Sequence, residues 1–347
     1  MFFRKKFLAA ALVIPGVAAL LPLVASAHEN YVLTKGEIDA GMADWSINVW
    51  NSLTAPGNIA VAAKFGSGLI ILYIVYFFFE RSACGAAFDR WIRRGESFGD
   101  ALLRIILGVS LLYSARLGVF LGPEIPLSSI PGGQYFSVAL YILGALMVLG
   151  FFSRVAGAGA MVIALLATWT YKDYMLTYFN YFGEFVALAL WSSYIFSIDR
   201  LRDKTKIVAD KVRQWEAVIL RVTYGISILY PAISIKILHP AIIVEIVKQY
   251  HLTDVSWLFP PDPLLISLGT GLTQIVVGLA IIVGFETRLN SLMTFALYVM
   301  SILYFKEAVW PHYILLALAT YLFINDGGDW TLDSWLKKKQ FAAALGK

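Results

Sequence analysis

Long apolar stretches separated by short polar segments make up most of the chain after residue 58. A membrane-spanning helix needs about 20 mainly apolar residues, and the stretches that approach this length are 59–79, 101–121, 134–152, 156–172, 176–198, 214–236, 263–285, 288–305 and 308–325. None alternates with a period of two, and backbone groups in lipid must be hydrogen-bonded within their own segment. The pattern therefore predicts an all-α polytopic membrane bundle with about nine transmembrane helices.

Composition supports this class of protein. Hydrophobic residues make up 59% of the chain and charged residues only 15%, against roughly 45–50% and about 25% in soluble domains. The single cysteine, Cys84, excludes a disulfide within the chain and any cysteine-rich metal cage. We find no phosphate-binding loop, nucleophile elbow, zinc-protease motif or mid-helix histidine pair for haem.

The N-terminus has the layout of a signal peptide over residues 1–27. Its parts are the basic Arg4–Lys6, the apolar stretch 7–24 and the small residues Ala25–Ala27. The alternative is an uncleaved first membrane helix, but Pro15, Gly16 and Pro22 make this stretch a poor spanning helix. Residues 28–58 are polar, and we expect them to be exported. Residues 59–100 then supply one additional transmembrane helix and a basic cytoplasmic loop.

Basic residues indicate the orientation. With residues 28–58 outside and the helices alternating from there, most of the 28 Lys and Arg residues fall inside; those outside are Lys35, Lys64, Arg116, Lys172, Lys236, Lys248 and Lys306. This positive-inside asymmetry predicts a plasma (inner) membrane protein with an extracytoplasmic mature N-terminus and a cytoplasmic C-terminus. The basic segment 201–213 is either an amphipathic helix on anionic headgroups or a solvated hinge.

The segment 201–213 separates two units with the same motifs in the same order, 101–200 and 214–335, and a tail follows at 336–347. Arg104-x-x-x-Gly108-x-Ser110-x-x-Tyr113 matches Arg221-x-x-x-Gly225-x-Ser227-x-x-Tyr230; Gly150-Phe151-x-x-Arg154 matches Gly284-Phe285-x-x-Arg288; Lys172-Asp173 matches Lys306-Glu307; Tyr194-Ile-Phe-x-x-Asp199 resembles Tyr321-Leu-Phe-x-x-Asp326. Each unit begins and ends inside, so we expect parallel four-helix repeats.

This repeated unit resembles the DoxX/DoxD family of membrane proteins. The resemblance covers about 101–335 and rests on the Arg-x-x-x-Gly start, the Gly-Phe-x-x-Arg turn and the ending Tyr321-Leu-Phe-Ile-Asn-Asp326-Gly327-Gly328-Asp-Trp330-Thr-Leu332-Asp333. The first unit departs after Asp199, where it lacks the Gly-Gly-x-Trp. The resemblance implies a link to redox chemistry: DoxD-type members are subunits of thiosulfate:quinone oxidoreductase, and others associate with thiol-stress enzymes.

Glu184 is the most unusual charge in the sequence. It lies about two turns into an apolar helix, where a carboxylate needs a partner or a proton. Lys172, at the end of the preceding helix, is the expected partner. Such a pair is either functional or a structural ion pair that fixes the register of the helices.

A second group of candidates is predicted around one outer opening of the second unit: Lys236, His239, Lys306, Glu307 and His312. All four histidines fall at the outer side in this topology, and imidazoles both titrate near neutral pH and bind metals. The alternative is a set of interfacial side chains solvated by headgroups. Signal cleavage would also expose His28, whose amine and imidazole form a copper-chelating pair.

The leading functional hypothesis is a membrane subunit of a quinone-linked oxidoreductase that acts at the extracytoplasmic face. Lys172, Lys236, His239, Lys306 and Glu307 would bind the substrate, and Glu184 and His312 would exchange protons with a quinone. Aromatic residues near the helix ends form either an interfacial belt or a quinone pocket. The alternatives are a scaffold or assembly factor without a ligand, and a small-solute or metal carrier, so the sequence leaves open whether the chain is an enzyme. A partner redox subunit is expected with the first hypothesis.

Overall fold

A computed structural model describes residues 32–190, 196–199, 210–255, 260–305, 310–328 and 330–336. The predicted signal peptide, His28, Lys306, Glu307, most of the basic linker and nearly all of the tail lie outside these residues. The described chain is helical apart from one antiparallel hairpin, β1 (Val119–Phe120) with β2 (Gly122–Pro126).

Five helical segments are long and apolar enough to cross a membrane: Pro56–Glu80, Ala83–Leu117, Ser153–Leu190, Trp215–Ile237 and Pro263–Val283. A shorter apolar helix covers Gly133–Leu149. These segments support the prediction of a helical membrane protein in a lipid environment. Every one of the predicted apolar ranges also contains a helix.

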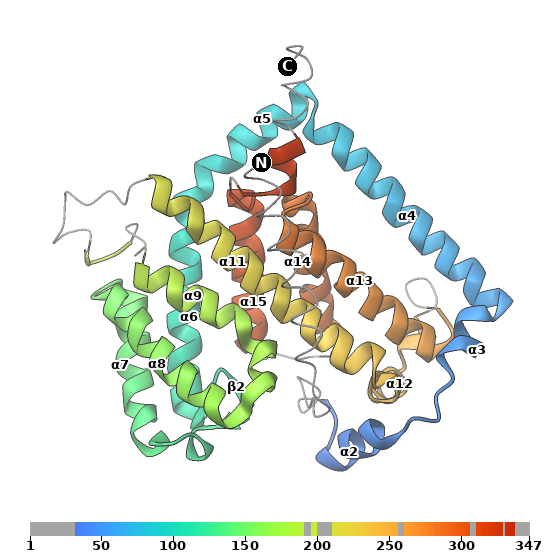
Figure 1. Cartoon of the computed structure of the whole chain (residues 1–347), viewed down its shortest axis with the longest axis horizontal. Coiled ribbons are helices and arrows are strands. Elements are labelled where there is room, and N and C mark those ends of the chain that lie inside the picture. Colours follow the sequence, from blue (N-terminus) through green and yellow to red (C-terminus); the bar gives the residue numbers. More distant parts are fainter. Residues whose placement is uncertain are drawn as a thin grey trace, which may run out of the picture.

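In the first group, each helix packs against the next helix along the chain (Figure 1). The group consists of α6 (Glu96–Leu117), α7 (Phe136–Leu149), α8 (Ser153–Tyr171), the 3₁₀ segment η5 (Lys172–Tyr178) and α9 (Phe179–Leu190). Helices α6 and α7 approach closely because both carry glycine at the crossing: a Cβ on Gly108 would lie 2.7 Å from the carbonyl oxygen of Gly144.

The second group consists of α11 (Asp210–Pro231), the π-helical η6 (Ala232–Ile237), α12 (Pro240–Gln249), η7 (Leu252–Asp254), α13 (Pro263–Val283), α14 (Thr287–Phe305) and α15 (Trp310–Asn325). Helices α11 and α13 cross as α6 and α7 do, because a Cβ on Gly225 would lie 2.7 Å from the Gly278 carbonyl oxygen. Helix α12 is an addition that the sequence analysis did not predict; it follows Pro240, which suits the first turn of a helix.

The two groups pack reciprocally. Helix α6, the first of its group, packs against α15, the last of the other, and α11 packs against α9 in the same way. This arrangement places the first and last helices of both groups at the centre of the bundle, while α7 and α8 lie on its outside (Figure 1).

Buried arginines complete the helix ends at one end of the bundle, here called the turn end. Arg104 donates to the carbonyl of Val148 at 3.0 Å and to that of Phe196 at 2.8 Å. Arg221 donates to the carbonyl of Trp330 at 2.8 Å. Both arginine side chains are buried, so they satisfy backbone carbonyls that the ends of helices leave without intrahelical partners.

Two carboxylates, the half-buried Asp199 and the buried Asp333, complete the same turns from the other side. Asp199 accepts hydrogen bonds from the backbone N–H groups of Phe152 and Ser153 at 2.9 and 3.0 Å. Asp333 accepts one from Glu286 N–H at 2.7 Å. The sequence comparison paired Asp199 with Asp326, but these contacts pair it with Asp333. That prediction is corrected: the first group does have an ending equivalent to Trp330–Asp333, namely Phe196–Asp199.

Helix α4 (Pro56–Glu80) runs along one side of the second group, and α5 (Ala83–Ile92) with η2 (Arg93–Gly95) connects it to α6 (Figure 1). No residue in its most apolar 18-residue window is buried. Polar contacts hold it near its ends: Asn58 donates to Asp262 at 2.5 Å, and the Arg81 guanidinium lies 3.3 Å from the Glu286 carboxylate. The short helices α2 (Lys35–Ala43) and α3 (Val49–Thr54) precede it.

The contact between α4 and the second group contains a carboxyl pair. Burial, with the nearby Asp333 and Glu80 carboxylates, raises the pKa of Glu286, although a hydrogen bond from Arg81 opposes this. The Glu80 and Glu286 carboxyl groups are neighbours, and two adjacent carboxyl groups favour a proton on one of them. The protonated form of Glu286 is therefore the one that this contact stabilises.

We expect the bundle to lose stability as the pH rises from about 4.5, the ordinary carboxyl value, through the raised pKa of Glu286. In that range the folded state binds more protons than the unfolded state, so the free energy of unfolding falls with pH. Thermal unfolding in detergent across this range measures the slope. Glu286→Gln should flatten it; an unchanged slope in this variant would assign the pH dependence to other groups.

Glycine at the α11–α13 crossing gives a second prediction. Gly225→Ala should lower the free energy of unfolding by about 1–3 kcal/mol, because the added methyl group meets the Gly278 carbonyl and Ile282. Gly269→Ala, on the same pair of helices, is the matched control: it has no atom within 4 Å and should be neutral or slightly stabilising. Equal unfolding temperatures for the two variants would contradict the crossing.

Candidate functional site

Glu184 is a buried carboxylate at the contact between the two groups of helices. It lies on α9 with 1% of its surface exposed. Its Oε1 accepts a hydrogen bond from the Asn180 amide at 3.1 Å, while its Oε2 has no hydrogen-bond partner among the described residues. Gly183 brings α9 against α11, because a Cβ there would overlap the Thr223 hydroxyl. A buried carboxyl oxygen without a hydrogen-bond partner is costly and calls for an explanation.

Two buried tyrosines lie close to Glu184. The Tyr181 and Ser110 hydroxyl groups are 2.9 Å apart, and the Tyr224 hydroxyl donates to the carbonyl of Leu315 at 3.2 Å. Both phenols are near enough to Glu184 to interact with its charge. They join α6, α9, α11 and α15 at one place.

A third tyrosine, Tyr298, lies between Tyr224 and His312. Tyr224 interacts with Tyr298 of α14, whose ring centroid lies 5.6 Å from that of His312 with an angle of 33° between the planes. His312 is in the first turn of α15 and is buried. We call the set Asn180, Tyr181, Glu184, Tyr224, Tyr298 and His312 the central polar row.

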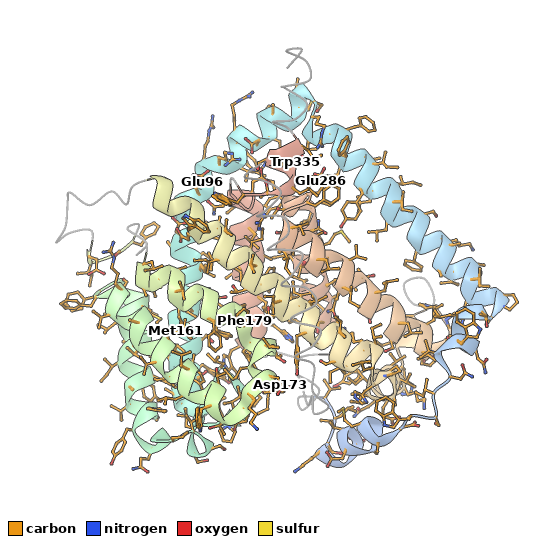
Figure 2. The ribbon with its side chains drawn as sticks, in the orientation of Figure 1. Glu96, Met161, Asp173, Phe179, Glu286 and Trp335 are labelled. Carbon is orange, nitrogen blue, oxygen red and sulfur yellow. The ribbon has the colours of Figure 1, made fainter. Side chains whose placement is uncertain are left out.

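The expected ion pair between Lys172 and Glu184 is wrong. Lys172 is exposed at the start of η5, whereas Glu184 is buried and takes the Asn180 amide instead. The neighbouring Asp173 accepts a hydrogen bond from the Tyr230 hydroxyl at 3.1 Å. Figure 2 shows Asp173 at the end of the bundle opposite to Glu286 and Trp335; we call this opposite end the hairpin end.

The histidines predicted at one outer opening have different neighbours. His239 is buried, and its ring packs edge-on against Trp45 at 4.8 Å. Burial lowers its pKa, although a hydrogen bond with the Met42 backbone opposes this. His239 therefore joins α12 to the N-terminal segment, while His312 belongs to the central polar row. Lys236 lies half-buried on η6.

Metal binding finds no support in the described part of the chain. Among those residues, no group of three or more His, Cys, Asp or Glu side chains could hold a metal ion. The predicted copper site depends on His28, and two of the predicted substrate-binding residues are Lys306 and Glu307. All three residues lie outside the part of the chain that the structure describes.

Asn180, Tyr224 and Tyr298 were not predicted as site residues, although the sequence carries a signal for the residues that α9 contributes to the central polar row. Counted from the paired turns, Asn180, Tyr181 and Glu184 occupy the places that Ile314, Leu315 and Leu318 have on α15. The aliphatic residues are buried as well. Aliphatic side chains therefore fill the matched buried places of α15.

Comparison with family models, with curated proteins and with solved structures gives no match for this chain. The chemistry must therefore be argued from the site. A carboxyl group, phenols and an imidazole that follow one another through an apolar interior can hold and move protons.

Replacing the polar residues of α9 by those at the matched places of α15 should stabilise the protein. Asn180→Ile with Glu184→Leu removes a buried carboxyl group and its amide partner together, a change that is often neutral or stabilising by about 1–4 kcal/mol. Glu184→Leu alone should gain less, because it leaves the Asn180 amide without an acceptor. Thermal unfolding in detergent compares the two; a lower unfolding temperature for the double variant would show that these residues support the fold.

Proposed function

We propose that the chain is a membrane subunit of a quinone-linked oxidoreductase, similar to thiosulfate:quinone oxidoreductase, that works at the extracytoplasmic face. In this function Glu184 and His312 exchange protons with a quinone bound near the central polar row. Reduction of a quinone takes up two electrons and two protons. The subunit would supply the protons, and the electrons would come from the exported substrate, directly or through a partner redox subunit.

The central polar row is the observation that carries this proposal. Glu184, Tyr224, Tyr298 and His312 follow one another where α9, α11, α14 and α15 meet. Ionisable residues inside a membrane are costly and are kept for proton or ligand handling. The aliphatic residues at the matched places of α15 support a functional reason for keeping them.

The same proposal includes nine transmembrane helices and two duplicated units. The support is the pairing of contacts at the turn end: Arg104 with Arg221, Asp199 with Asp333, and the reciprocal packing of first and last helices. Parallel repeats of this kind have their turn ends on one side of the membrane. The distribution of Lys and Arg supports a cytoplasmic position for that side.

Thiosulfate-dependent quinone reduction tests the function in membranes of cells that produce the full chain. Glu184→Gln and His312→Ala should each lower kcat by about 100-fold, within the range that a positioned proton donor contributes. His251→Ala is the matched control, because this histidine is exposed and outside the row. Wild-type membranes without this activity, or full activity in both row variants, would contradict the proposal.

A small-solute carrier is the second candidate, and the reciprocal packing of the two groups favours it. Transporters built from parallel repeats bind their solute between the repeats, which is where Glu184 lies. Uptake of a panel of anions and copper into vesicles containing the purified chain separates the two functions. Uptake that depends on Glu184 without quinone reduction would replace the first proposal by the second.

A further inference from the structure

Four tyrosines follow one another from the hairpin end of the bundle to the central polar row. Tyr171 ends α8, Tyr174 and Tyr178 lie on η5, and Tyr181 lies on the first turn of α9. The distances between successive ring centroids are 6.3, 6.2 and 6.2 Å. Tyr174, Tyr178 and Tyr181 are buried. The four rings therefore form a line from the hairpin end into the apolar interior, and we call this hydroxyl-bearing series the tyrosine line.

A carboxylate meets this line at its outer end. Glu124 of β2 is half-buried, and its Oε1 accepts a hydrogen bond from the Tyr174 hydroxyl at 2.9 Å. Gly122, on the same strand, allows a closer approach. A Cβ on this residue would lie 1.8 Å from the Tyr178 hydroxyl and 2.8 Å from Glu124 Oε2. The Tyr178 hydroxyl and the Glu124 carboxylate thus face each other across a glycine that has no side chain to separate them.

Tyr181 connects the line to the buried acid. Its hydroxyl is hydrogen-bonded with that of Ser110, and it lies near enough to both Glu124 and Glu184 to interact with their charges. Glu184 accepts a hydrogen bond from Asn180 and interacts with Tyr181 from its own helix and with Tyr224 from α11. Glu124 therefore stands at the surface end, and Glu184 at the interior end, of the tyrosine line.

We infer that Glu124, Tyr178 and Tyr181 form the route by which protons from the extracytoplasmic side reach Glu184. The inference rests on the proposed function and its orientation, and it names the path that supplies the site. Each step breaks one O–H bond and forms another. Glu124 receives a proton from water, each phenol passes on its own proton as it receives the next, and the Glu184 carboxylate becomes the acid. No electrons move.

Packing alone does not explain every hydroxyl group of the tyrosine line. At the places matched with Tyr178 and Tyr181, α15 has His312 and Leu315, and it packs in the same position without tyrosines. A leucine fills such a place and leaves no hydroxyl group to satisfy. The Tyr181 hydroxyl is therefore an addition at a place that a leucine fills in the other group, whereas the place of Tyr178 holds a buried polar side chain in both groups.

The test is the rate at which Glu184 becomes protonated after the external pH is lowered. The full chain is reconstituted in liposomes with the hairpin end outward, and time-resolved infrared spectroscopy follows the carboxyl band that Glu184→Gln removes. Glu124→Gln and Tyr181→Phe should each slow this band by about 100-fold, and Glu124→Asp should restore part of the rate. Tyr141→Phe, an exposed tyrosine on α7, is the matched control.

The outcomes separate the path from the function. A Glu184 band that appears at the wild-type rate in Glu124→Gln and Tyr181→Phe would overturn the path and leave the proposed function standing. Absence of any band that depends on Glu184 would overturn both. Since Tyr178→Phe and Tyr181→Phe keep the ring that packs, unchanged thermal unfolding of these variants would assign a slower rate to the lost hydroxyl group.

Discussion

The rest of the bundle depends on one constraint: the backbone N–H and C=O groups at the turn end must find hydrogen-bond partners. Helix ends leave carbonyl and N–H groups without partners, and lipid offers none. Arg104 and Arg221 bind the carbonyls, and Asp199 and Asp333 accept the N–H groups. These contacts fix where the following helices start. The position of α9 against α11, and with it the position of Glu184, follows from them.

The sequence predicted the helices well because their signal is local. Apolar length, Gly-Phe turns and the placement of Lys and Arg are properties of single segments. The partners of Glu184 could not be predicted in this way, because Tyr224 and Tyr298 come from helices far away in the sequence. Its charge made Lys172 the expected partner, yet its side chain is exposed. Such a pairing depends on the burial of both residues and on the distance between them, and a hydropathy pattern shows neither.

The two groups of helices can also be compared with each other at their turns. Phe152 occupies on the first group the place that Glu286 has on the second, and both adopt positive φ. Phe152 is exposed, while Glu286 is buried beneath α4 and contacts Arg81. The acidic residue thus belongs to the docking of α4 rather than to the turn. Differences between the groups point to specialised positions more directly than similarities do.

The attachment of α4 has a mechanical consequence. A helix of 25 residues is about 37 Å long, whereas the hydrocarbon layer measures about 30 Å, and tilting is one way in which a helix of this length fits the layer. Helix α4 is tethered to the second group at Asn58 and Arg81 near its ends and by the Tyr73 hydroxyl, which donates to Asn290 at 2.5 Å. A change in bilayer thickness would therefore load the tethers at Asn58, Tyr73 and Arg81 before it disturbed the helices of the two groups.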